Sequence, residues 1–154
     1  MRKKISRMGN HINAGKEVIG ASLVPIVCID DTEYFLLFKR NHGPGKGTYT
    51  SLGGCAENSE TGIQAATRKA YDVTSGYLVV LPEDVLHSTL PGNWPTYFVS
   101  ATGILSSLSA CLNHEYSDCK MVATSAKAIF SDHEVNDVTE LQLYDYIQWK
   151  LANG

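Results

Sequence analysis

The chain has 154 residues with a formal net charge of −3, 19% charged residues and 44% apolar residues. This length suits one domain that buries roughly 68–70% of the surface of the unfolded chain, so we expect residues 1–154 to form a single domain. The mildly acidic balance argues against general nucleic-acid binding. No run of about 18 apolar residues occurs, which argues against a membrane span.

The four cysteines have neither the close C-x-x-C pairing of a zinc site nor the density of a secreted disulfide scaffold. We therefore expect reduced thiols and a cytoplasmic location. The N-terminal residues are basic, but no apolar stretch of signal-peptide length follows them. We expect residues 1–16 to be flexible or peripheral, and a small electrostatic handle for a polyanion is the alternative.

Residues 18–29 form a nearly continuous apolar run rich in β-branched residues, which is typical of a strand covered on both faces. Pro25 cannot donate to a ladder, so it predicts an edge or a bulge near the middle of this strand. A turn at residues 30–32 leads to a second apolar run at residues 34–40, and the two runs predict a hairpin.

Residues 41–47, N-H-G-P-G-K-G, combine three glycines with a proline, which excludes regular structure and permits close approach of the backbone to a ligand. Lys39, Arg40 and His42 make this loop locally basic. An exposed connection with ordinary surface charges explains the same pattern. A short strand is expected at residues 49–52.

Residues 52–76 read L-G-G-C-A-E-N-S-E-T-G-I-Q-A-A-T-R-K-A-Y-D-V-T-S-G. This stretch resembles the Nudix box, G-x5-E-x7-R-E-U-x-E-E-x-G-U with U an aliphatic residue. Gly54, Glu60 and Arg68 match the pattern at the right spacings. The downstream half departs from it, because the three expected glutamates are Lys69, Asp72 and Val73, and Ser75 replaces the glycine.

The same stretch predicts a helix from its local pattern alone. Thr61 and Gln64 fit a capping box, and apolar residues repeat at helical spacing from Ile63 to Val73, so we expect a helix over residues 62–74. Val73 extends the apolar stripe at a position where the resembled enzymes keep a metal ligand. Lys69 and Val73 share one helix face.

Strands are expected at residues 77–81, 85–88 and 96–104, with a turn at 90–95 between the last two. In the last strand one face should be core, since Tyr97, Val99 and Ala101 alternate with Phe98 and Ser100. Residues 105–118 fit either a loop or a short helix, and residues 121–130 predict a strand followed by a turn.

The C-terminal stretch predicts a closing helix with Asp137 or Thr139 as N-cap. Its predicted buried stripe contains Leu141, Tyr144, Ile147 and Leu151. Trp149 falls outside that stripe and raises self-association as a homodimer as an alternative.

The resemblance implies an α/β fold, a Nudix-like α/β/α sandwich with a central mixed sheet, the box helix and a C-terminal helix. It also implies that the loop at 41–47 lies beside the substrate. The candidate phosphate contacts are therefore Arg40, Lys46 and Lys69. The candidate residues for stacking on a base are Tyr49, Tyr71 and Trp94, although Trp94 would equally serve to cover the sheet edge. The structural residues of the box are Gly53, Gly54 and Arg68, with Arg68 tied to Glu57 and Glu60.

The leading hypothesis is a Nudix-fold protein that binds a nucleotide or a nucleoside-diphosphate-linked compound, with weak or absent magnesium-dependent hydrolysis. No cofactor is then required. The first alternative is an active pyrophosphohydrolase that uses magnesium or manganese held by Glu57, Glu60, Asp72 and an acid from outside the box, Glu115 or Glu134. The second is a protein-interaction module on a closed Nudix fold.

Overall fold

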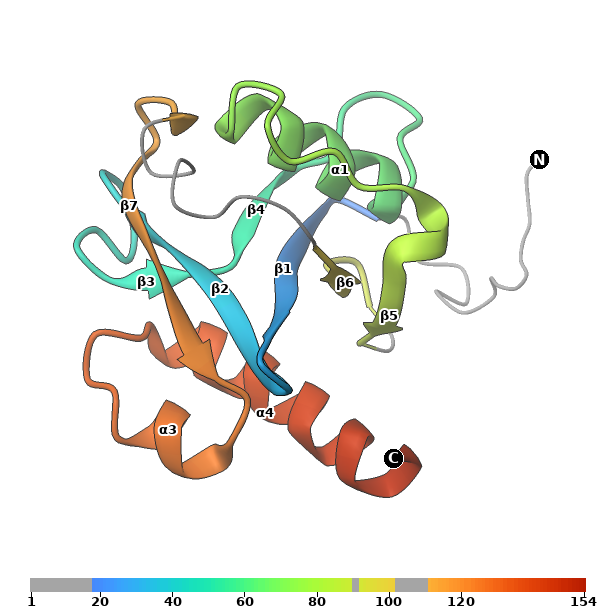
Figure 1. Cartoon of the computed structure of the whole chain (residues 1–154). Coiled ribbons are helices and arrows are strands. Elements are labelled where there is room, and N and C mark those ends of the chain that lie inside the picture. The colour runs from blue at the N-terminus through green and yellow to red at the C-terminus, as the bar shows by residue number, and fades with distance from the viewer. Residues whose placement is uncertain (1–17, 90–91, 102–110) are drawn as a thin grey trace.

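The computed structural model consists of a central mixed sheet with helices on both faces (Figure 1), and it describes residues 18–89, 92–101 and 111–154. The expectations for residues 1–16, and those parts of the predicted turn and connections that fall at 90–91 and 102–110, lie outside the described residues. The strands are β1 (Gly20–Ile29), β2 (Thr32–Arg40), β3 (Tyr49–Thr50), β4 (Leu52–Cys55), β5 (Val85–Ser88), β6 (Thr96–Ser100) and β7 (Tyr116–Ala123). The helices are α1 (Gly62–Val73), η1 (Pro82–Asp84), α3 (Ala126–Phe130) and α4 (Asp137–Asn153).

The sheet has the order β3-β2-β1-β6-β5, while β4 pairs with β1 and β7 pairs with β2. The β1 and β6 strands run parallel, and the other pairs are antiparallel. Figure 1 shows α1 on one face of the sheet and α3 with α4 on the other. The expected α/β/α sandwich is therefore confirmed.

Side chains of β1 alternate between two cores, one on each face of the sheet. Ala21 and Leu23 belong to the cluster that contains Val73 of α1. Val24 belongs to the second cluster, which contains Tyr146 of α4. Alternation along a strand places successive side chains on opposite faces, so the sequence of β1 is apolar throughout because both of its faces are covered.

The predicted hairpin is confirmed, with a two-residue turn at Asp30 and Asp31. Both residues have positive φ, 49° and 66°, as a tight turn of this kind requires, and aspartate tolerates that conformation. Pro25 lies in an interior strand rather than at an edge. Its position is tolerated because β1 pairs with β4 before it and with β2 after it on that side.

Three strand predictions differ from the structure. Residues 77–81 form no strand and pair with no described strand. The N–H groups of Tyr77 and Leu78 bond instead to Thr74 at the end of α1. In β6 both faces are core rather than one, since Phe98 and Val99 are both fully buried. The strand expected from residue 121 begins earlier, at residue 116.

The predicted stripe on the C-terminal helix is confirmed at Ile147 and wrong at its other three positions. Leu141 and Leu151 are 70% and 76% exposed, whereas the buried positions are Thr139, Leu143, Tyr146 and Ile147. Apolar residues occur around this helix, so spacing alone does not select the buried face. Tyr146 sets it by packing between Phe35 and Phe98.

The ends of α4 correct two further expectations. Its N-cap is Asn136, whose side chain accepts hydrogen bonds from the next residues of the helix, rather than Asp137 or Thr139. Trp149 is not a free surface aromatic, because its ring stacks on His87 of β5 at a centroid distance of 4.6 Å. Among the described residues, no helix is both long and apolar enough to cross a membrane.

Candidate functional site

The box helix begins as its sequence predicts. Gln64 N–H donates to the Thr61 hydroxyl, and Thr61 N–H donates to the Gln64 side chain, at 3.2 and 2.9 Å. This capping box satisfies N–H groups that the first turn of a helix leaves free. The helix start, and hence the direction of the box loop, is therefore determined by local sequence.

Arg68 ties the loop before the helix to the helix itself. Its guanidinium donates to both carboxylate oxygens of Glu60, at 2.9 and 3.1 Å, and to the Cys55 carbonyl at 3.0 Å. Carboxylate oxygens of Glu57 and Asp72 lie 3.6 and 3.7 Å from the same guanidinium. The hydrogen bond from Arg68 holds the pKa of Glu60 below its usual value. The three carboxylates proposed as metal ligands thus converge on an arginine side chain.

The side chain of Lys69 extends from α1 to a residue that is distant in the sequence. Its ammonium Nζ lies 2.7 Å from Oε2 of Glu115, and the two side chains are only 18% and 27% exposed. The stem of Lys69 passes over Gly54, where an added Cβ would lie 3.1 Å from its Cδ. Gly54 therefore provides the space that lets Lys69 reach Glu115.

Glu115 is held in place by the segment that precedes it. Asn113 N–H donates to the Val73 carbonyl at 2.8 Å, and the Asn113 side chain accepts from Glu115 N–H at 2.9 Å. Burial opposes ionisation of Glu115, but the hydrogen bonds and charge of Lys69, with Asn113, outweigh it and hold the pKa of Glu115 below its usual value. Glu115 is the acid from outside the box that the sequence suggested, and in the structure it lies against a lysine.

The residues of the box do not fit a magnesium or manganese ion. Such ions take several oxygen ligands, usually carboxylates and water. Val73 is fully buried in the core, Lys69 presents a cation, and Asp72 lies beside Arg68. Within the described ranges, no three His, Cys, Asp or Glu side chains are grouped so that they could hold a metal ion. Glu134, the other suggested acid, pairs with Lys120.

The six candidate ligand residues do not form one cluster. Tyr49 is wrong as a stacking residue, because it is 6% exposed, its hydroxyl donates to Asp118 and Lys120 covers its ring. It belongs, with Tyr146, to the core cluster on the face opposite α1. The ring of Trp94 lies over Gly20, and its indole N–H donates to the Ser22 hydroxyl at 2.9 Å. Trp94 thus covers the start of β1, also on the face away from α1.

Among the candidates outside the box, Arg40 lies close to it. It is the last residue of β2 and pairs in register with Tyr116 of β7, directly after Glu115. The main chain of the neighbouring loop is tied to the same segment, because Asn41 N–H donates to the Glu115 carbonyl at 2.9 Å. Lys46 is exposed on the same loop.

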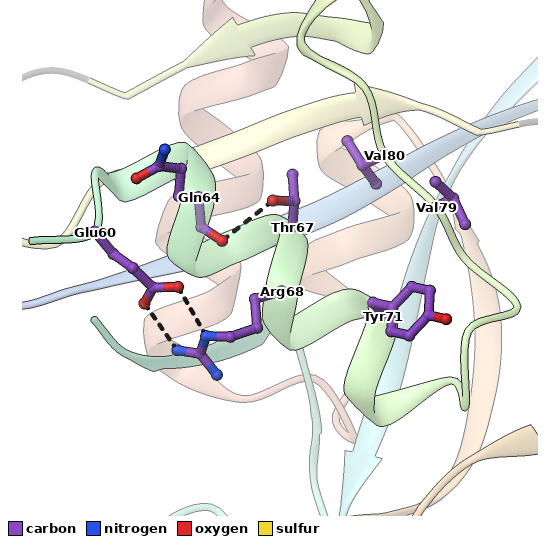
Figure 2. Close-up of a pocket in the computed structure, with 7 residues that line it drawn as sticks. All are labelled: Glu60, Gln64, Thr67, Arg68, Tyr71, Val79 and Val80. Carbon is purple, nitrogen blue, oxygen red and sulfur yellow. Dashed lines mark hydrogen bonds and ion pairs between the residues drawn. The ribbon is translucent and has the colours of Figure 1, made fainter. Parts of the chain in front are cut away.

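Tyr71 lies elsewhere, in a groove on the outer side of α1 (Figure 2). The groove has a volume of about 450 Å³ and is lined by Glu60, Gln64, Thr67, Arg68, Tyr71, Val79 and Val80. Tyr71 and Val79 are 54% and 60% exposed, so they offer an apolar wall next to the polar side chains of the helix. Sequence reasoning missed Val79 and Val80. The apolar run after the helix was the available signal, but it was interpreted as a strand.

No protein-family model and no curated protein matches the sequence. Solved structures do match the fold. A Nudix hydrolase from M. smegmatis, RenU, has a TM-score of 0.62 and 16% identity, with 88% of each chain covered. A C. elegans Ap4A hydrolase has a TM-score of 0.57 and 16% identity, covering 88% of this chain and 99% of its own.

The NUDIX domain of Shewanella oneidensis NrtR, solved with ADP ribose, has a TM-score of 0.58 and 18% identity, covering 88% of this chain and 89% of its own. These likenesses extend over most of the chain, well beyond the box. At such low identity they establish a common architecture, which agrees with the resemblance in residues 52–68 and with the sandwich in Figure 1. The chain has the fold of the Nudix hydrolases.

Proposed function

We propose that this protein binds a nucleotide or a nucleoside-diphosphate-linked compound and does not hydrolyse it efficiently by the metal-dependent route. The observation that carries the proposal is the ion pair between Lys69 and Glu115, at 2.7 Å. It occupies the side of the box helix where the resembled enzymes hold a divalent ion. The box is therefore proposed to be a degenerate one that retains its framework and not its metal chemistry.

An ammonium group cannot replace a catalytic metal ion. A metal ion polarises the phosphoryl oxygen and lowers the pKa of a bound water, which then attacks phosphorus. Lysine is a point charge with three N–H donors and has no free coordination position for water. Glu115 also balances the charge of Lys69. The pair therefore supplies neither a nucleophile nor a surplus positive charge.

The nature of the ligand is inferred from structural neighbours together with the groove. One neighbour was solved with ADP ribose and another is an Ap4A hydrolase, and both of these compounds are nucleosides joined through phosphates. The exposed ring of Tyr71 beside Val79 offers an aromatic and apolar surface. Stacking of a base on an aromatic side chain contributes about 1–3 kcal/mol, so Tyr71 is the stacking residue we favour.

Isothermal titration calorimetry tests this proposal directly. ADP-ribose, dinucleoside polyphosphates, nucleoside triphosphates and cyclic nucleotides are titrated first in EDTA and then in magnesium, and each mixture is assayed for phosphate release. We expect at least one compound to bind with an affinity that EDTA does not change, without turnover. Failure of every compound to bind would count decisively against the proposal.

A pair of tyrosine variants locates the base. Tyr71→Ala should weaken binding of the nucleotide by about tenfold, which corresponds to about 1.4 kcal/mol. Tyr77→Ala is the matched control, because Tyr77 is 42% exposed and does not line the groove. Equal losses in the two variants would show that the base does not stack on Tyr71.

The competing enzymatic hypothesis is favoured by one observation, the convergence of Glu57, Glu60 and Asp72 on Arg68. If these carboxylates exchanged Arg68 for a metal ion, magnesium- or manganese-dependent phosphate release would follow. Such release should then disappear in Asp72→Ala and in Glu60→Gln. Turnover in the wild-type protein that both substitutions abolish would replace our proposal by this one.

A further inference from the structure

The cations on the α1 face of the sheet differ in their partners. Arg68 is surrounded by Glu57, Glu60 and Asp72, and Lys69 is paired with Glu115. Arg40 pairs in register with Tyr116, whose side chain belongs to the core on the α1 face, so Arg40 lies on that face as well. It has no carboxylate within 4.0 Å in the part of the chain that the structure describes. An anionic ligand that approaches this face would therefore meet, at Arg40, a positive charge that no described carboxylate balances.

The Nε atom of Arg40 is buried and has no hydrogen-bond partner among the described residues. A buried polar group without a partner is destabilising, and the effect is larger for a charged group. Such atoms are rare in folded proteins, where nearly all buried polar groups are satisfied. The Nε of Arg40 is therefore a group that an added acceptor would stabilise.

The surrounding backbone keeps the guanidinium in this position. The β2–β7 ladder shifts register between Lys39 and Arg40, and such irregularities change the direction of a side chain. The glycine loop lies directly over Arg40, since an added Cβ would be 3.4 Å from its Nη2 at Gly43 and 3.4 Å from its Cδ at Gly45. Both glycines have positive φ, 75° and 82°, so a side chain there would introduce strain as well as crowding.

Arg40 also lies close to the first residues of the box. Burial raises the pKa of the Tyr116 phenol, while the charge of Arg40 and a hydrogen bond from the Gly53 N–H act in the opposite direction. Arg40 pairs in register with Tyr116, and Gly53 bonds to the Tyr116 phenol, so the three residues are neighbours. The stacked imidazoles of His42 and His114, with ring centroids 6.1 Å apart, join the loop to the segment before Tyr116.

We propose that Arg40, beneath the loop of residues 41–47, is the anion-binding point of this protein and takes phosphate oxygens of the ligand directly, without a divalent cation. This inference rests on the proposed function and specifies which residue replaces the metal in holding the diphosphate. Guanidinium groups suit this role, because their planar N–H donors bind two phosphate oxygens at once. Lys69 is excluded from it by its pairing with Glu115.

Inorganic pyrophosphate in EDTA is the probe, followed by calorimetry and by backbone amide chemical shifts. The wild-type protein should bind it with shifts centred on residues 40–47. Arg40→Gln should weaken binding by at least about tenfold. Lys127→Gln is the matched control, because it removes one positive charge from the exposed surface of α3 and should leave the affinity unchanged.

Two further measurements separate binding from folding. Pyrophosphate should raise the melting temperature of the wild-type protein and not that of Arg40→Gln, whose own melting temperature without pyrophosphate should not be lower. If Arg40→Gln fails to fold, Arg40→Lys decides the question, since it retains the charge but loses the paired donors and should bind more weakly.

The failures are distinguishable from one another. Pyrophosphate binding that survives in Arg40→Gln but is lost in Lys69→Gln would overturn this inference and leave the proposed function intact. A wild-type protein that binds a nucleotide but not pyrophosphate would do the same. Failure to bind either probe would overturn both.

Discussion

The coupling between Lys69 and Glu115 is the most direct test of the rearranged site. Lys69→Met keeps most of the side-chain length and removes the ammonium, which leaves the Glu115 carboxylate without its partner at 2.7 Å. A hydrogen bond to a charged group contributes about 1.5–3 kcal/mol, whereas a fully exposed ion pair contributes about 0.2–1 kcal/mol. Exposures of 18% and 27% place this pair between a surface pair and a buried one.

We therefore expect Lys69→Met to lower the free energy of unfolding by about 2 kcal/mol near neutral pH. For a chain of 154 residues, this corresponds to a decrease of about 4–8 °C in melting temperature. The assay is urea unfolding of the wild type, Lys69→Met, Glu115→Gln and the double variant, which together give a coupling energy. We expect a coupling of about 1–1.5 kcal/mol.

The pH dependence gives an internal control. The pKa of Glu115 is lowered in the folded protein from the ordinary value of 4.5. Its contribution to stability is therefore complete above the unfolded pKa and is lost as the pH falls through the lower folded pKa. Two results would refute the inference that the Lys69–Glu115 pair takes the place of a metal ion in organising the site. One is a coupling energy below about 0.5 kcal/mol near neutral pH. The other is a coupling energy that persists unchanged in strongly acidic buffer.

Three further predictions concern the framework around the site. Thr61→Ala removes the N-cap of α1 and should lower the free energy of unfolding by about 1 kcal/mol in urea titrations, whereas Thr67→Ala, on the same helix, should cost less. Val73→Glu, which restores the box pattern at this position, should destabilise the fold by at least about 3 kcal/mol in the same assay, because Val73 is fully buried. Burial and Glu33 raise the pKa of Tyr146, so stability should fall as the pH rises above its ordinary value of 10.0, and Tyr146→Phe should remove that alkaline loss in thermal melts.

Local signals in the sequence were sufficient for the elements that local contacts determine. The capping residues Thr61 and Gln64 lie three positions apart and define the start of α1. The paired aspartates after β1 likewise define the hairpin turn, because their conformation is restricted within the turn itself. In both cases the stabilising interaction joins residues within one turn of chain, so the pattern is visible without knowledge of the fold.

The arrangement of the site could not be predicted in the same way. Glu115 is 46 positions from Lys69, and only the fold brings the two together. The face on which Tyr49 lies is set by the register of β3 with β2, and a shift of one residue would have placed it on the other face. The buried face of α4 is likewise chosen by the shape of Tyr146 against the sheet. Long-range pairing therefore decides which candidate residues meet.

The framework of the box and its charges are physically separable. Thr61, Gln64 and Arg68 hold the loop and helix through hydrogen bonds that involve no metal ion, and Gly54 is needed here for the passage of a lysine stem. The fold can therefore persist while the charge of the site is rearranged. The positive charges of Lys69 and Arg68 are both balanced by carboxylates. A phosphate would therefore be attracted to Arg40, under the glycine loop, rather than to the helix. A ligand bound there would lie beside Glu115, whose negative charge is acceptable only while Lys69 remains paired with it.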